Sequence, residues 1–73
     1  MAYDPPTADE VRYLVQQHWR GYEDASKRVN ADNGEFVRMK VQATLDRLRA
    51  LIRSGVDPND AENQAMREIT LVD

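Results

Sequence analysis

The chain of 73 residues contains no cysteine and few residues that interrupt helices. Without cysteine it can form neither a disulfide nor a thiolate metal site. There are three glycines and three prolines, so long stretches are free to form regular structure. No apolar run approaches the roughly 20 residues that a membrane-spanning helix requires. These absences favour a small, non-membrane protein that is stabilised by packing alone.

Size and charge limit the choice of function. A chain this short forms one domain at most and buries only about 60% of its unfolded surface. Such domains often gain stability by docking on a partner or on a second copy. Thirteen acidic and ten basic residues give a net charge of −3, which has the wrong sign for a general nucleic-acid binder. The first residues have neither the basic nor the apolar region of a signal peptide, so we expect a cytoplasmic protein.

The middle of the chain carries the clearest helical pattern. Between Glu35 and Ser54 there is no proline or glycine, and apolar residues recur at the three- and four-residue steps of an amphipathic helix. They are Val37, Val41, Leu45, Leu48 and Ile52. Gly55 followed by Val56 predicts a Schellman-type stop.

An earlier helix is indicated between residues 7 and 30. Thr7 and Glu10 have the spacing of a capping box, and Pro5 and Pro6 favour an extended arm before it. A heptad seam follows: Val11, Val15, His18, Tyr22, Ala25 and Val29. Gly21 lies inside this helix at a cost of about 1 kcal/mol relative to alanine, so we expect close approach of another helix there.

Two breaks separate the helices. Asn30 to Gly34 suits a helix end, and Asp32 with Glu35 suggests a second capping box. The alternative is one continuous helix through Gly34. After the second break, Asp57 as N-cap and Pro58 at the first helical position start a third helix. We expect this helix to direct inward Ala61, Ala65, Ile69 and Val72. Its last turn, from Thr70, should fray.

These patterns predict an all-α fold, a small helical bundle. The short link between the first two helices favours a long antiparallel hairpin, with the third helix packed at its open side. The predicted segments of the single domain (1–73) are an extended arm at 1–6 and helices at 7–30, 34–54 and 58–71.

His18 and Trp19 are the residues whose side chains most readily suggest a catalytic or binding role. The only histidine could be a general base, a metal ligand or a pH switch, but a metal site needs three or four ligands and the helical neighbours of His18 supply none. We expect a half-buried His18 with one hydrogen bond. We expect Trp19 in the core, with an exposed binding hot spot as the alternative. No phosphate loop, dinucleotide motif or calcium loop is present, so we predict no enzyme, no cofactor and no catalytic or metal-binding residue.

The main functional hypothesis concerns a second apolar strip on the middle helix. Opposite the main stripe lie Phe36, Met39, Ala43 and Ala50. Small residues admit another helix closely, and a methionine adapts to different partners. We predict that this strip, with Arg53 beside it and Tyr13 on the first helix as a weaker candidate, binds another protein or a second copy of this chain. The alternative is that the third helix, or the arm with Tyr3, covers the strip within one chain.

The arginines of the same helix support a second hypothesis. Arg38, Arg49 and Arg53 lie on one side of the main stripe, and Lys40 and Arg47 on the other. Flanking charges of this kind are typical of solvated edges of a core helix. The first three are also the candidate contacts to nucleic acid, or to an acidic protein.

The leading interpretation is a non-enzymatic protein–protein interaction module: a small adaptor, assembly component or inhibitor. A nucleic-acid-binding helical protein and a structural virion or scaffold component are the alternatives. No motif identifies a family. The size, the sharp caps and the lack of enzymatic motifs are typical of small accessory proteins of phages and mobile elements.

Overall fold

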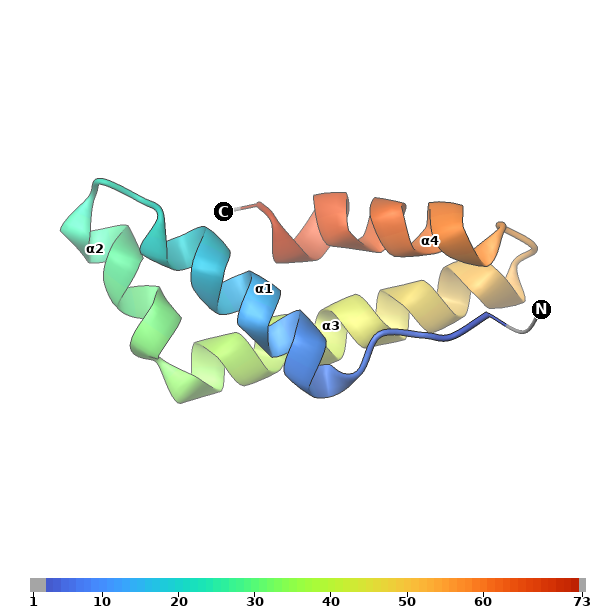
Figure 1. The fold of residues 1–73 in the computed structure, drawn as a ribbon, viewed down its shortest axis with the longest axis horizontal. Helices are drawn as coiled ribbons and strands as arrows, with labels where there is room; N and C mark the ends of the chain where they lie inside the picture. Colours follow the sequence, from blue (N-terminus) through green and yellow to red (C-terminus); the bar gives the residue numbers. More distant parts are fainter. Residues whose placement is uncertain (1–2, 73) are drawn as a thin grey trace.

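The computed structural model describes residues 3–72, which form helices joined by turns and preceded by an extended arm, with no strand in that range. Residues 1–2 of the predicted arm, and residue 73, lie outside that range. The helices are α1 (Ala8–Arg20), α2 (Ala25–Arg28), α3 (Gly34–Arg53) and α4 (Pro58–Ala65) (Figure 1). A 3-10 turn, Val29–Asp32, leads into α3, and a π-helical turn, Met66–Thr70, continues α4. The prediction of a small all-α bundle is confirmed.

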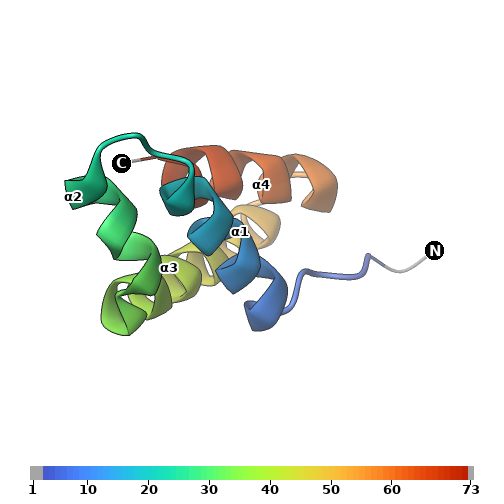
Figure 2. The same ribbon diagram turned by 60° about the vertical axis from the view of Figure 1, so that its left-hand side comes forward.

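The long helix α3 is the axis on which the other elements pack. α4 returns antiparallel along α3, whereas α1 crosses α3 obliquely (Figures 1 and 2). The extended arm leaves α1 and passes toward the far end of α3 (Figure 1). The molecule measures 41 × 18 × 18 Å.

Local capping rules set several of the helix boundaries. The Thr7 hydroxyl accepts from the Glu10 backbone N–H at 3.1 Å, and the Glu10 carboxylate accepts from the Thr7 N–H at 3.4 Å. The predicted capping box is therefore confirmed. Asp57 caps α4 by accepting from the Asn59 N–H at 3.0 Å, with Pro58 at the first helical position as expected.

Gly55 ends α3 as a Schellman motif, which the sequence also predicted. Its φ of +104° lies where side chains cause strain. The Gly55 N–H donates to the Ile52 carbonyl at 3.1 Å, and the Val56 N–H donates to the Leu51 carbonyl at 3.0 Å. Val56 then packs against the apolar cluster between α3 and α4, which starts α4 close to α3.

The prediction of one helix from 7 to 30 is wrong, and with it the long first arm of the hairpin. α1 ends at Arg20, and the backbone N–H of Gly21 closes it on the carbonyls of His18 and Trp19. Asp24 then caps the short α2 by accepting from the Ser26 N–H at 2.9 Å. The glycine and the Asp24 cap are local stop and start signals, which the heptad seam obscured.

The bend after α1 has a packing consequence. Arg28 Nη1 donates to the carbonyls of Tyr22 and Glu23 at 3.2 and 3.3 Å, which holds the bend. The folded-back chain buries Ala31 completely in the core beside α1. Val29, expected in the seam, is 62% exposed.

The cap of α3 also differs from the prediction. The Asn33 side chain accepts from the Phe36 N–H at 3.1 Å, so Asn33 and not Asp32 is the N-cap. An N-cap needs extended backbone, and Asn33 has it, whereas Asp32 ends the 3-10 turn. The alternative of one continuous helix through Gly34 is wrong as well.

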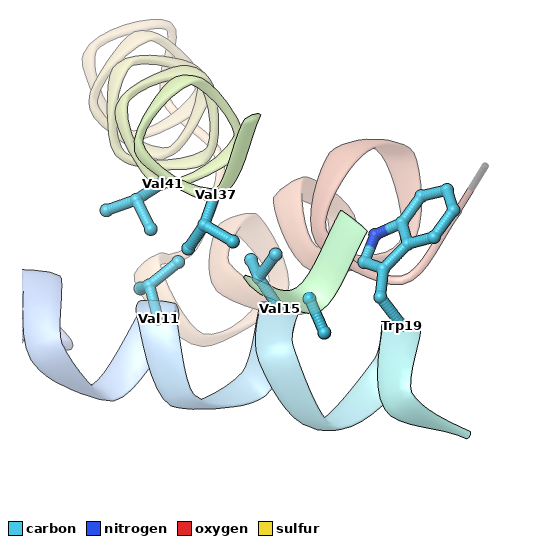
Figure 3. Packing of buried hydrophobic residues seen from close by; sticks show 6 residues of the cluster. Val11, Val15, Trp19, Val37 and Val41 are labelled. Atoms are coloured by element: carbon cyan, nitrogen blue, oxygen red, sulfur yellow. The ribbon is translucent and has the colours of Figure 1, made fainter. Parts of the chain in front are cut away.

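Two apolar clusters form the core. The first joins α1 to α3 through Val11, Val15, Trp19, Ala31, Val37 and Val41 (Figure 3). The second joins α3 to α4 through Leu48, Leu51, Ala61 and Ala65. α4 packs on one side of the predicted stripe of α3, so Thr44 and Leu51 are buried there. Leu45 and Ile52, on the other side of the stripe, are only half-buried.

The end of α4 departs from the predicted helix at 58–71. The Leu71 N–H donates to the Met66 carbonyl, five residues back, at 2.8 Å. This wider turn adds one residue to the register. Thr70 therefore points into the core at 0% exposure, while Val72, predicted to point inward, is 37% exposed. Thr70 is thus the last residue of the helical turn, and Leu71 and Val72 lie beyond its end.

Candidate functional site

Phe36, the largest member of the predicted strip, turns inward. Its ring lies 5.0 Å from that of Trp19 in an edge-to-face contact at 87°. The Lys40 ammonium lies 5.9 Å from the centre of each ring. Phe36 is therefore half-buried against the first core cluster. The ring that it contacts, Trp19, belongs to α1.

The remaining strip is exposed on the outer side of α3. Met39 is 62% exposed, and Ala43 and Ala50 are exposed as well. Arg53 is exposed at the end of the same helix. The structure thus keeps three of the four strip residues available, with Met39 as the only large one.

Tyr13 does not join this surface. It is 61% exposed on α1 and lines a shallow hollow with its own helix neighbours, Asp9, Glu10 and Leu14. No residue of α3 contributes to that hollow.

The basic residues of α3 divide into two groups. On the α4 side they are used internally: Lys40 Nζ donates to the Ile69 carbonyl at 2.9 Å, and Arg47 Nε pairs with Glu68 at 2.8 Å. Burial lowers the pKa of Lys40, and the Arg47 hydrogen bond, followed by that of Gln64, lowers the pKa of Glu68. These contacts hold the end of α4 against α3.

On the opposite side of α3 the arginines remain exposed. Arg49 pairs with Asp46 of the same helix at 3.3 Å, where both side chains are more than half exposed. Arg38 and Arg53 make no ion pair or hydrogen bond with any other residue in the range 3–72. The three predicted nucleic-acid contacts therefore share one exposed side of α3.

A groove that the sequence did not predict runs along this arginine side. It has a volume of 710 Å³ and lies between the N-terminal arm and the second half of α3. Its lining residues are Tyr3, Pro5, Pro6, Ala8, Leu45, Leu48, Arg49, Ile52 and Arg53. The half-burial of Leu45 and Ile52 reflects this groove, because the arm covers them only in part. The signal in the sequence was an apolar stripe wider than one short helix can cover.

A second hollow of 360 Å³ adjoins this groove and shares Ala8 and Leu45 with it. It lies between α1 and the first half of α3, and Arg12 and Arg38 contribute to its lining. Together the two hollows follow α3 over most of its length.

The arm that walls the groove is held at its outer end. The Tyr3 hydroxyl donates to the Glu62 carboxylate on α4 at 2.9 Å. Burial, followed by this hydrogen bond to Glu62, raises the pKa of Tyr3 to about 12. The arm therefore bridges from the start of α1 to α4.

His18 and Trp19 take the structural roles expected from the sequence. His18 Nε2 and the Tyr22 hydroxyl share one hydrogen bond of 3.1 Å, and His18 is half-buried. Trp19 is 4% exposed in the first core cluster. Within residues 3–72, no three His, Cys, Asp or Glu side chains gather where they could hold a metal ion.

Two further findings concern the chain as a whole. None of the helices described between residues 3 and 72 has both the length and the apolar character needed to cross a membrane. No protein-family model matches the chain, and neither a curated protein nor a solved structure matches it.

Proposed function

We propose that this chain is a non-enzymatic protein–protein interaction module, a small adaptor, assembly component or inhibitor that acts in the cytoplasm. The observation that carries the proposal is the exposed outer side of α3. α1 and α4 pack against the other sides of this 20-residue helix. Met39, Ala43 and Ala50 remain exposed. A flexible methionine beside two alanines suits the close approach of a helix from another protein or from a second copy.

The surroundings of the only histidine support a role without catalysis. Its ring bonds to a phenol and contacts two aromatic rings edge-on, those of Trp19 and Tyr22, at 5.9 and 5.3 Å. A general base is usually oriented toward a nucleophile by a carboxylate or a similar group. The phenol and the aromatic rings serve packing instead.

Self-association is tested by sedimentation velocity over a range of concentrations, and other partners by affinity capture from the native host with mass spectrometry. Met39→Glu combined with Ala43→Glu places two charges on the proposed surface. Asn63→Glu, on the exposed side of α4, is the matched control. We expect the double variant to lose the partner or the oligomer and the control to keep it. A strictly monomeric chain that captures the same proteins with and without the two charges would contradict this surface.

Nucleic-acid binding through Arg38, Arg49 and Arg53 is the second candidate. It is favoured by the common exposed side of these arginines, two of which have no partner within residues 3–72. Binding of this kind weakens steeply with salt, so retention on DNA or RNA should fall between about 50 and 200 mM. No retention at the lower salt concentration excludes it.

A structural part of a phage particle or of another scaffold is a special form of the interaction function. It predicts that the chain joins a regular assembly instead of a single partner. Electron microscopy of the concentrated protein, or of complexes captured from the host, distinguishes the two.

A further inference from the structure

We infer that the groove between the N-terminal arm and α3 is a docking site for an acidic peptide segment with bulky apolar side chains, supplied by another protein. The inference rests on the proposed interaction function and specifies the class of partner. The docking groove lies beside the exposed strip of α3, and Arg53 lies between the groove and the strip.

The groove has the shape of a side-chain binding site. Leu45, Leu48 and Ile52 form its apolar floor over two helical turns, which is about 10 Å at 1.5 Å per residue. Pro5 and Pro6 form part of the opposite wall. The volume of 710 Å³ lies in the range of about 300–1,000 Å³ that is common for ligand sites. Leu45 and Ile52 are half-buried, and apolar side chains of a partner would bury them fully.

The charge around the groove selects the partner. Every charged residue that lines the groove or the adjoining hollow is an arginine, and neither is lined by a carboxylate; the four are Arg12, Arg38, Arg49 and Arg53. This is the reverse of the chain as a whole, whose net charge is −3. Asp9 and Asp46 engage Arg12 and Arg49 from outside the lining. The other two arginines have no partner within residues 3–72 and can bind carboxylates in a bidentate manner.

The arm makes the groove available before the partner arrives. The hydrogen bond from Tyr3 to Glu62 anchors its outer end, and the capping box at Thr7 fixes its inner end. Between these points, Pro5 and Pro6 restrict the backbone. A wall that is already ordered lowers the entropic cost of binding.

The apolar floor distinguishes this site from a phosphate-binding surface. A nucleic acid would use the arginines but would gain little from a floor of leucine and isoleucine. A peptide with carboxylates on either side of apolar residues satisfies both parts of the groove. Oligonucleotide binding that depends on Arg49 and Arg53 would therefore contradict the inference.

The direct test is selection of binders to the full chain from a random peptide display library. We expect enriched peptides that combine Asp or Glu with at least two bulky apolar residues. Synthetic versions are then titrated by fluorescence polarisation against Arg49→Glu combined with Arg53→Glu. This double variant should bind at least tenfold more weakly, whereas Arg67→Glu, outside both hollows, should bind as the unmodified chain does.

Further variants and measurements keep the outcome interpretable. Circular dichroism checks that each variant is folded, and the neutral pair Arg49→Gln with Arg53→Gln replaces the glutamates if they disturb the end of α3. Tyr3→Phe releases the arm and should weaken binding by a smaller factor. Amide chemical shifts on titration should change most around Leu45 and Ile52.

Several results would overturn the inference. One is that no peptide is enriched, and another is that enriched peptides bind the Arg49 and Arg53 variants undiminished. If binding is lost on Met39→Glu with Ala43→Glu but kept in the arginine variants, the groove is wrong and the interaction function stands. If the chain enriches no peptide, captures no protein and stays monomeric, both fail.

Discussion

Thr44 on α3 and Thr70 at the end of the π-helical turn share a hydrogen bond of 2.6 Å between their hydroxyl oxygens, inside the core. The Thr44 hydroxyl also donates to the Lys40 carbonyl at 2.8 Å. Because a hydroxyl has one proton, Thr70 is the donor to Thr44. This pair ties the C-terminal turn to α3, together with the contacts of Lys40 to the carbonyls of Ile69 and Val72.

Removing one hydroxyl of this pair should destabilise the fold. Thr44→Val leaves the buried Thr70 hydroxyl without its acceptor, at a cost of about 1–3 kcal/mol in the free energy of unfolding. Thr70→Val should cost less, because Thr44 keeps its bond to Lys40. Urea unfolding of the two single variants and the double variant should show that the double costs less than the sum. Additive effects would mean that the two hydroxyls are not coupled.

Phe36 and Met39 are expected to respond in opposite ways to truncation. Phe36→Ala removes the edge-to-face contact with Trp19 and opens the first core cluster, and should lower the free energy of unfolding by about 2–3 kcal/mol. Met39→Ala should change it by less than about 0.5 kcal/mol, because the side chain is exposed. Thermal or urea unfolding measures both. Equal effects of the two substitutions would show that Phe36 is not part of the core.

The glycines at the two ends of α3 form a matched pair. Gly55→Ala should destabilise the protein by about 1–2 kcal/mol, because its positive φ is unfavourable for alanine. Gly34→Ala should be neutral or stabilising by up to about 1 kcal/mol, since an added Cβ meets nothing within 4 Å there. Thermal unfolding of both variants tests this. A Gly55→Ala protein as stable as the unmodified chain would contradict the Schellman ending of α3.

The anchor of the arm should give a pH dependence at high pH. The pKa of Tyr3 is raised from 10.0 to about 12 in the folded chain. The folded state therefore holds a proton that the unfolded state has already lost, so the stability from Tyr3 is complete below pH 10. It is lost as the pH rises from 10 to about 12.

Comparison with Tyr3→Phe isolates this contribution. The difference in unfolding free energy between the two proteins should shrink over that pH window. The ultraviolet titration step near pH 12 should be absent from the variant. If the phenol that is lost in the variant titrates near pH 10 instead of pH 12, Glu62 does not hold Tyr3.

The sequence predicts most accurately the features that are controlled by local interactions. The caps at Thr7, Asp57 and Gly55 each involve residues within a few positions along the chain, so spacing alone predicts them. Gly21 and Asp24 carry the same kind of local signal, which ends α1 and starts α2 although the heptad seam continues through them. Within the candidate site, the exposure of Met39 was predicted, whereas the inward turn of Phe36 was not.

The sequence by itself determined that this is a chain of capped amphipathic helices with a basic middle helix, because periodicity and capping are properties of neighbouring residues. Only the tertiary structure decided which residues on the two margins of the α3 stripe are buried. α4 packs on the Thr44 and Leu51 side, and the arm only partly covers Leu45 and Ile52. The direction in which short elements cross a helix depends on contacts between residues far apart in the sequence. The arginine-lined groove exists because α4 packs on the other side of α3 and the arm leaves Leu45 and Ile52 partly uncovered.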